Sequence, residues 1–390
     1  MGGLRTGTKS DLMPCLENLV PVKEDLSTPK VQVNILDGAA IINMLRPGTA
    51  KTFQGYATDV FVPYVTSQLQ HFLRINDNKT ELFSFLASNV ADIDTNKHLI
   101  TTQGTGVLCS NRQDVSALAP CTHEEADTRI LLHLQDAVQQ GYSKVSIRTV
   151  DTDVVVLAIA SANRLNISEL WIAFGAGKSF RFIAAHEIAK ALGPDRCVAL
   201  PMFYAFTGCD TVSCFGGRGK KTAWDTWTIY GDVTPAFCAL GAMPDPRAID
   251  EWMQPLERFV VLLYDRTSTE EGVNQARKQL FSKKGRTIDG LPPTQAALIQ
   301  HTKRAVYQAG HCWAQMMTPA PELPSPSEWG WNKKPGGGWS ITWTTLPEAS
   351  EACRELLRCG CKNGCRGRCK CQKAALQCTA LCQCGGQCSE

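Results

Sequence analysis

The cysteines of this chain gather at one end of the sequence. Ten of the 18 fall within residues 353–390, a segment that contains four large apolar residues, all leucine. A segment so short and so poor in apolar side chains should fold only when it binds metal. The start of the chain, Met1 to Glu17, lacks the apolar core of a signal peptide, so we expect an intracellular protein with reduced thiols. A metal site is therefore favoured over the alternative, a disulfide framework.

Nine of these cysteines follow a repeated spacing, in which Cys-x-Cys pairs alternate with longer gaps. Three tetrahedral zinc ions need 12 ligand positions, and nine thiolates supply them if three thiolates bridge two ions each. Seven Lys and Arg against two Glu give this segment a charge of +5, which leaves −2 for the rest of a chain whose net charge is +3. The predicted zinc ligands are Cys359, Cys361, Cys365, Cys369, Cys371, Cys378, Cys382, Cys384 and Cys388.

Two breaks in composition divide the rest of the chain. A weak one lies near 283–293, and a stronger one lies at 318–338, where five prolines and three successive glycines indicate an extended linker. We expect the tryptophans of this linker to pack against neighbouring segments rather than to stack on bases. The predicted parts are an extension at 1–30, a main domain at 31–290, a helical segment with a Pro-, Gly- and Trp-rich linker at 291–350, and the cysteine-rich domain at 353–390.

Apolar runs alternate with helical patterns through the main domain. Three runs are predicted strands, and helical patterns follow the first run, precede the second and follow the third, where Gly193 should end the helix. This order predicts an α/β fold with a mostly parallel sheet flanked by helices. The strands are expected at Val31–Leu36, Val145–Val150 and Leu170–Phe174, and the helices at Ala39–Leu45, after Glu124 and Asp127, and around Ala184–Leu192.

Acidic residues stand where these predicted strands end and where helices begin. In an open α/β sheet, sites form beyond the carboxyl ends of the strands, so these acids could converge. Carboxylates crowded together repel one another unless divalent cations lie between them, and oxygen ligands suit Mg²⁺ or Mn²⁺. Two such ions about 4 Å apart can hydrolyse a phosphodiester. The candidate ligands are Asp37, Glu124, Glu125, Asp127, Asp151, Asp153 and Asp210.

Each of these acids also has a purely structural explanation. Thr122 and Glu125 fit a capping box, and Asp151 and Asp210 could be helix caps. Asp37 could belong to a turn with Gly38. Taken together these explanations weaken, because Asp-x-Asp at the exit of a buried strand is unfavourable without a nearby cation.

A glycine-rich turn at 215–223 leads into a predicted helix. Glycines let backbone amides approach a phosphate, and lysines add positive charge. The spacing differs from that of a Walker loop. The candidate nucleic-acid contacts in this turn are Gly217, Gly219, Lys220 and Lys221.

The motifs Ile35-Leu36-Asp37-Gly38, Glu124-Glu125-Ala126-Asp127, Val150-Asp151-Thr152-Asp153 and Gly208-Cys209-Asp210, with the glycine–lysine turn, resemble the flap endonuclease and XPG-like branch of the PIN nuclease superfamily over about 31–227. The resemblance implies a PIN-like fold and a helix-hairpin-helix that grips a DNA backbone. It also implies two magnesium ions bound by Asp37, Glu125, Asp127, Asp151, Asp153 and Asp210. Helical spacing keeps Glu124 as a further candidate, because it shares a face with Asp127.

One segment of that family's pattern is missing. Similar proteins have a second strand that ends in another metal-binding Asp, followed by a basic segment. Here the chain passes from His71 to Phe72 without either. The catalytic centre implied by the resemblance therefore lacks one expected ligand.

The tail resembles the tesmin-like CXC domain, a trinuclear zinc module that binds DNA. Arg368 stands where DNA-binding members commonly have a tyrosine, and it is a candidate DNA contact. The function we expect is therefore a Mg²⁺- or Mn²⁺-dependent nuclease held on nucleic acid, DNA rather than RNA, by its zinc tail. The alternative is a nucleic-acid-binding protein that retains the fold but not the reaction. We expect no membrane span, and a nuclear location follows from the expected partner.

Overall fold

The computed structural model describes residues 4–21, 29–37, 98–110, 112–123, 125–165, 167–282 and 290–346, together with Ser84, Ala87, Ser88, Cys371 and Cys382. The chain forms two compact units, Met1–Trp343 and Thr344–Glu390. The helix predicted at Ala39–Leu45 and the region around His71, where a second strand is missing from the sequence pattern, lie outside the described residues. No helix among the described residues is long and apolar enough to cross a membrane.

The first unit contains a four-stranded sheet in the order β1-β4-β5-β6. The first three strands are parallel, and β6 runs antiparallel to β5 at the edge. The prediction of a mostly parallel sheet flanked by helices is confirmed, and β6 is the strand that the pattern did not predict. The strands are β1 (Val33–Leu36), β4 (Lys144–Thr149), β5 (Glu169–Phe174) and β6 (Arg181–Ala184).

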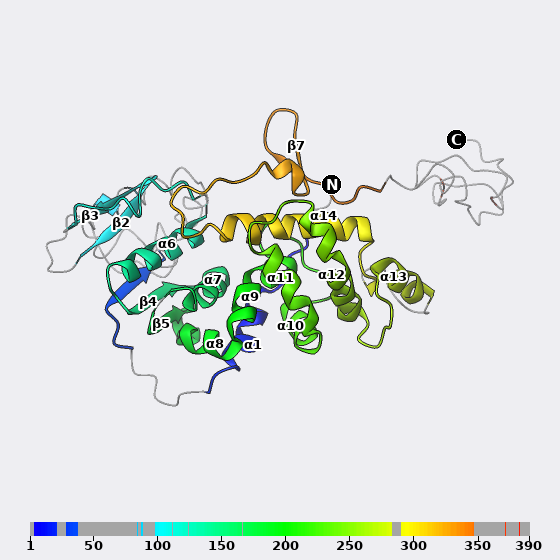
Figure 1. Cartoon of the computed structure of the whole chain (residues 1–390), viewed down its shortest axis with the longest axis horizontal. Helices are drawn as coiled ribbons and strands as arrows, with labels where there is room; N and C mark the ends of the chain where they lie inside the picture. Colours follow the sequence, from blue (N-terminus) through cyan, green and yellow to red (C-terminus); the bar gives the residue numbers. More distant parts are fainter. Residues whose placement is uncertain are drawn as a thin grey trace, which may run out of the picture. The chain divides into compact units, whose positions relative to one another are not determined.

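The helices that follow or precede these strands lie beside the sheet (Figure 1). Helix α7 (Thr152–Ala162) is buried at every residue, because its sequence is apolar on all sides. It packs against α6 (Ala126–Gln139), α8 (Ala185–Leu192) and α9 (Pro194–Phe206). Gly193, with φ of 77°, separates α8 from α9, as predicted from its position after the periodic residues.

A larger helical part extends from α9 away from the sheet (Figure 1). Its core contains the stacked rings of Phe203 and Trp227, with Phe237 against them and Phe206 against Phe237. The last helix runs along this part and continues into a π-helical turn that reaches α6. The elements are α10 (Lys220–Ile229), α11 (Thr234–Leu240), α12 (Ala248–Tyr264), α13 (Val273–Ser282), α14 (Gln295–Val306) and the π-helical turn η5 (Tyr307–Trp313).

The N-terminal segment belongs to the core of the first unit. A 3₁₀ turn, η1 (Lys9–Leu12), leads into the short helix α1 (Met13–Glu17). Leu12, Met13 and Leu16 are fully buried in the same hydrophobic cluster as the sheet and helices. The predicted extension at 1–30 therefore includes residues that the core depends on.

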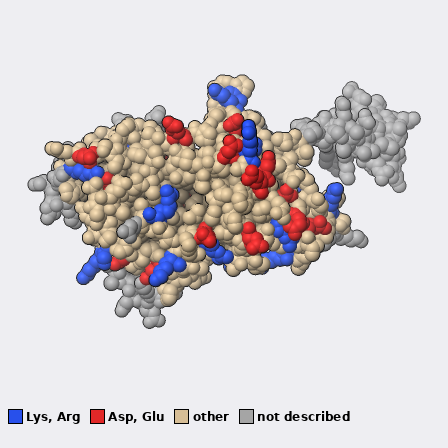
Figure 2. All heavy atoms as spheres, viewed as in Figure 1, with Lys and Arg blue, Asp and Glu red and all other residues tan. Residues whose placement is uncertain are grey.

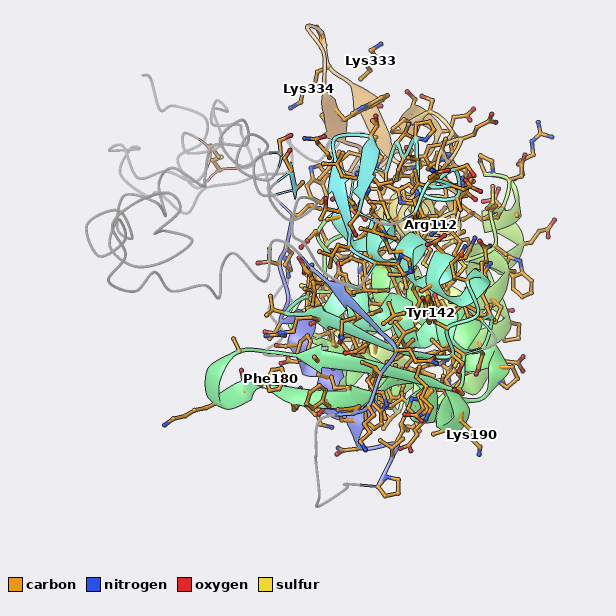
Figure 3. The ribbon with its side chains drawn as sticks, turned by 90° about the vertical axis from the view of Figure 1, so that its left-hand side faces the viewer. Arg112, Tyr142, Phe180, Lys190, Lys333 and Lys334 are labelled. Atoms are coloured by element: carbon orange, nitrogen blue, oxygen red, sulfur yellow. The ribbon has the colours of Figure 1, made fainter. Side chains whose placement is uncertain are left out.

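Two hairpins also lie in the described part of the first unit. Strands β2 (Ile100–Gln103) and β3 (Gly106–Cys109) form one, and β7 (Trp331–Lys333) and β8 (Trp339–Ile341) form the other. The second begins inside the stretch at 318–338 predicted as an extended linker, and it carries the exposed Lys333 and Lys334 outward (Figure 3). Just before it, Trp329 is buried against the ring of His311, in agreement with the packing role expected for a linker tryptophan.

Candidate metal site

Three predicted ligands meet at the carboxyl edge of the sheet. Asp151 precedes α7, Asp153 lies in its first turn, and Asp127 lies in the first turn of α6. Carboxylate oxygens of these three residues all lie within 4.8 Å of one another. They converge because α7 follows β4 directly and α6 begins at the same edge of the sheet. The three are called the aspartate trio below.

Asp151 has a structural role as well as its place in the trio. It is the N-cap of α7, and its Oδ1 accepts a hydrogen bond of 2.9 Å from the backbone N–H of Asp153. Its own N–H donates to Oγ1 of Thr149 at 3.0 Å, and that hydroxyl donates to Oδ2 of the buried Asp37 at 2.9 Å. The capping explanation for Asp151 is thus confirmed, and it does not exclude metal binding, since a carboxylate has two oxygens.

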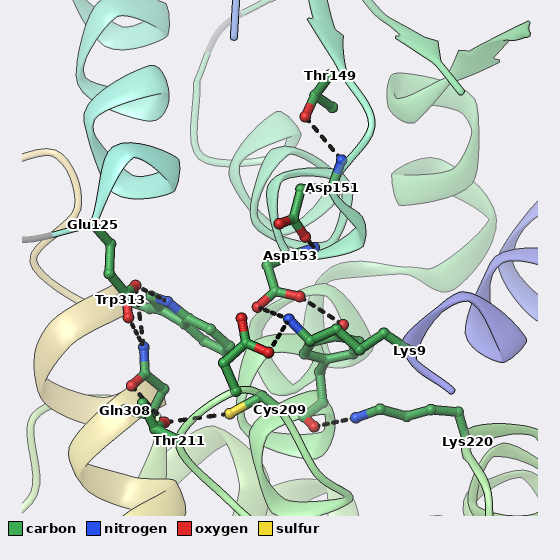
Figure 4. Close-up of polar contacts among 12 residues, drawn as sticks. Lys9, Glu125, Thr149, Asp151, Asp153, Cys209, Thr211, Lys220, Gln308 and Trp313 are labelled. Carbon is green, nitrogen blue, oxygen red and sulfur yellow. Dashed lines mark hydrogen bonds and ion pairs between the residues drawn. The ribbon is translucent and has the colours of Figure 1, made fainter. Parts of the chain in front are cut away.

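Asp153 is buried and its carboxylate is bonded on both oxygens (Figure 4). The hydroxyl of Tyr204 donates to Oδ1 at 2.7 Å, and the ammonium of Lys9 donates to Oδ2 at 3.1 Å. The same ammonium lies 2.7 Å from Oδ1 of Asp210, whose side chain is otherwise exposed. Asp210 therefore joins the site through Lys9.

Asp210 does not cap the next helix, which begins about ten residues later with Gly219 as its N-cap. The loop that carries it starts at Gly208, where φ is 113° and an added Cβ would lie 2.8 Å from the backbone of Cys214. A side chain at this position would displace the loop.

Glu125 lies at the start of α6 but is not part of a capping box. Its side chain makes no capping bond, and the carboxylate instead accepts hydrogen bonds from Nε2 of Gln308, at 3.0 and 3.2 Å, and from Nε1 of Trp313, at 3.1 Å. The capping-box explanation is wrong because α6 begins at Ala126, so Glu125 is itself the N-cap and not the third residue of the helix. The π-helical turn after α14 brings the two donors to the glutamate.

A cavity of about 190 Å³ opens beside these residues. Four predicted ligands make up much of its wall, and the rest of the wall comes from Ala126, from the neighbours of Asp210 and from the π-helical turn. The lining residues are Glu125, Ala126, Asp127, Asp153, Cys209, Asp210, Thr211, Gln308 and Trp313.

The electrostatics of the site favour a bound cation. Burial, followed by the negative charges of Asp151 and Asp153, raises the pKa of Asp127 to about 8. Burial and the charge of Asp151 also raise the pKa of Asp153, although Lys9 and Tyr204 stabilise its ionised form. The pKa of Lys9 is raised: burial opposes the ammonium charge, but the hydrogen bond to Asp210 and the charges of Asp153 and Asp151 outweigh it. Neutralising the trio thus requires a proton or a cation.

The glycine–lysine turn differs from its prediction at one residue. Lys220 is buried, and its ammonium donates to Oγ1 of Thr207 at 2.9 Å and to the backbone oxygen of Tyr204. Burial lowers its pKa to about 7. Lys220 is therefore not placed to bind a phosphate, because α10 begins at this residue and turns it toward the core. Lys221 is exposed and pairs with Asp225 at 3.2 Å, Gly217 lies in the turn with φ of 64°, and Gly219 is the N-cap.

Several residues of the site had no signal in the sequence pattern. Lys9, Tyr204, Gln308 and Trp313 lie in other segments, and their contacts with the acids span between 51 and 188 residues. Thr149, which contacts both Asp37 and Asp151, did have a signal in the sequence, because it stands on the predicted strand two residues before Asp151.

The remaining predicted site residues lie mostly outside the described residues. These are Glu124, Arg368 and seven of the nine tail cysteines. The two that are described, Cys371 and Cys382, are both buried, with their Sγ atoms 3.6 Å apart.

No family model matches this chain, and no match was found to a curated protein or to a solved structure. The likeness to PIN nucleases and to the CXC domain therefore rests on the residues and motifs quoted above.

Proposed function

We propose that this protein is a divalent-metal-dependent nuclease that hydrolyses phosphodiester bonds of DNA. The observation that carries the proposal is the aspartate trio, in which three carboxylates from two helix starts lie within 4.8 Å of one another beside a cavity. The PIN-like identity of the fold is part of the same proposal, and it rests on the motifs that end β1 and β4 and begin α6.

The residues of the trio fit Mg²⁺ or Mn²⁺. Their ligand atoms are carboxylate oxygens, which are the donors that these ions prefer. Burial and mutual repulsion raise the pKa of Asp127 to about 8, so a cation would relieve an unfavourable arrangement that folding imposes. Asp127, Asp151 and Asp153 would hold the ion, and Asp37 would support them through Thr149.

When bound, such an ion would activate a water molecule and stabilise the leaving oxygen of a phosphodiester. The chain's own groups surround that position. Glu125 lines the same cavity, and because Gln308 and Trp313 hold its carboxylate, it can accept a hydrogen bond from a water in a fixed direction. Tyr204 fixes the orientation of Asp153.

The cysteine tail would hold the nuclease on nucleic acid. Two thiolates bound to one tetrahedral zinc lie about 3.8 Å apart, and the 3.6 Å between the Sγ atoms of Cys371 and Cys382 supports the proposal of a zinc cluster.

On the face of the protein in Figure 2, the described basic and acidic side chains are interspersed rather than gathered into one basic patch. Three zinc ions and nine thiolates together carry a charge of −3, so the metallated tail keeps a charge of +2. This positive tail would attract DNA, with Arg368 as a contact, and a nuclear location goes with this partner.

The test is cleavage of 5′-flap, hairpin and single-stranded DNA by the purified chain with Mg²⁺ or Mn²⁺. Asp151→Asn should abolish cleavage while leaving the fold intact, because asparagine caps a helix as well as aspartate does. Asp250→Asn is the matched control, since Asp250 also lies in the first turn of a helix and is exposed away from the cavity. If the wild type binds DNA but cleaves none of these substrates, the alternative of a non-catalytic DNA-binding protein replaces the proposal.

Zinc analysis tests the tail separately. The full chain should contain three zinc ions, and a chain that ends at residue 346 should contain none. Fewer than three zinc ions in the full chain would remove the trinuclear cluster and leave the nuclease proposal standing.

A further inference from the structure

Lys9, in the N-terminal segment of the chain, brings a positive charge into the acidic site. Its ammonium lies 3.1 Å from Oδ2 of Asp153 and 2.7 Å from Oδ1 of Asp210, although it is 144 residues from Asp153 in sequence. The Lys9 side chain is 25% exposed, so it is largely enclosed by the protein.

The surrounding segment holds Lys9 in this place. On its C-terminal side, Leu12 and Met13 are buried in the core. On its N-terminal side, the backbone oxygen of Arg5 accepts a hydrogen bond of 2.9 Å from the N–H of Cys214. The segment that carries Lys9 is thus fastened on one side to the core and on the other to the loop that follows Asp210, which makes the contact a feature of the fold rather than of one flexible side chain.

Asp153 connects two different surroundings. Asp153 is a member of the aspartate trio, and its Oδ2 also accepts a hydrogen bond from Lys9, which pairs with Asp210 as well. In a two-ion centre a shared carboxylate lies between the ions, and each ion has further carboxylates on its own side. Here the trio supplies one such group of ligands, and in the second group the ammonium of Lys9 already lies between Asp153 and Asp210 and offsets part of their negative charge. A divalent ion at that place would stand beside a fixed positive charge.

We propose that Lys9 is a built-in cation that takes the place of the second divalent ion, so that the site binds one divalent ion, at the aspartate trio. This rests on the proposed function, because it concerns the number of ions in the same centre. It also departs from the two ions that the resemblance to PIN nucleases implies. Lys9 is a positioning and charge-balancing residue of the site.

The experiment counts Mn²⁺ bound to the zinc-loaded full chain, by electron paramagnetic resonance of the free ion during a titration. The wild type should bind one Mn²⁺ per chain and Asp151→Asn none. Lys9→Met keeps the length of the side chain but removes the charge, and it should raise the number to two. Lys9→Met combined with Asp210→Asn should return it to one.

The controls separate loss of charge from damage to the fold. Lys9→Arg should still bind one ion, and Lys190→Met, which changes an exposed lysine in the last turn of α8, should not change the count. Two ions in the wild type, or one ion in a folded Lys9→Met, would overturn the inference and leave the nuclease proposal intact. No bound Mn²⁺ in the wild type would instead overturn the proposed metal site itself. Should Lys9→Met not fold, the wild-type count still decides between one ion and two.

Discussion

The two sides of Asp153 balance negative charge in different ways. On the inner side, formed by the aspartate trio, carboxylates lie within 4.8 Å of one another and the pKa of Asp127 is raised to about 8. On the outer side, formed by Asp153, Lys9 and Asp210, an ammonium lies between two carboxylates. One acidic site thus combines a group of carboxylates that repel one another with a pair of carboxylates that already has the ammonium of Lys9 between them.

The largest expected effect comes from breaking the inner side. Asp127→Asn removes one carboxylate of the trio, so Mn²⁺ affinity should fall by at least about 100-fold, because even residues that only support metal ligands contribute about 10- to 100-fold. At neutral pH the metal-free variant should unfold at a higher urea concentration than the wild type, because the asparagine is neutral beside Asp151 and Asp153 without having to take up a proton on folding.

Isothermal titration with Mn²⁺ measures the affinity, and urea unfolding in a chelator measures the stability. Asp250→Asn, which lies outside the cavity, should change neither quantity. An Asp127→Asn variant that binds Mn²⁺ like the wild type would show that the trio is not the ion site.

The inner side should also make the metal-free protein less stable as pH rises. The pKa of Asp127 is about 8 in the folded chain against 3.8 as its ordinary value, so between these values the folded state holds a proton that the unfolded state has released. This contribution to stability is complete below about pH 4 and is lost as pH rises through 8, with a slope of at most about 1.4 kcal/mol per pH unit. Unfolding free energies of the wild type and Asp127→Asn at pH 5, 6.5 and 8 should show the slope reduced in the variant.

Breaking the outer side should have a smaller effect on stability. Lys9→Met leaves the buried carboxylate of Asp153 without its ammonium, while the exposed Asp210 can be solvated by water. We expect the metal-free protein to lose about 1–2 kcal/mol, less than for a fully buried ion pair. Chemical unfolding measures the loss. Added Mn²⁺ should increase the free energy of unfolding of Lys9→Met by more than it increases that of the wild type. If Mn²⁺ stabilises both proteins equally, Lys9 does not act as an internal cation.

The smallest effect is expected at Lys221, which belongs to neither side of Asp153. Its pair with Asp225 is exposed, so Lys221→Ala should change stability by less than about 0.5 kcal/mol. If Lys221 contacts a phosphate, the same change should reduce the salt dependence of DNA binding by about one ion equivalent. Fluorescence anisotropy at several salt concentrations measures this, and an unchanged slope would remove Lys221 from the nucleic-acid interface.

Much of the sheet region could be predicted from local pattern. The strands β1, β4 and β5 are short apolar runs, and α6 and α8 show helical spacing of apolar residues. The acids at the starts of α6 and α7 meet because both helices begin at the carboxyl edge of the sheet. The edge strand β6 was missed because its four residues, Arg181–Ala184, run without a break into α8.

The glycine–lysine turn shows where local pattern stops being sufficient. Lys220 and Lys221 are neighbours in sequence and identical in chemistry, yet the first is buried and the second is exposed. Successive residues of a helix point about 100° apart, so one turns to the core while the other faces water. Which of the two does so depends on how α10 packs, and composition carries no sign of it.

By itself, the sequence determined that acids stand at strand ends and helix starts, and that the cysteine-rich tail has too few apolar residues to fold as an ordinary core. The tertiary structure alone decided that Lys9 enters the site, that Tyr204 bonds to Asp153, and that Gln308 and Trp313 hold Glu125. The physical reason is distance along the chain. Strand and helix signals come from residues a few positions apart, whereas charge balance in a cavity depends on segments that only the packing of the core brings together.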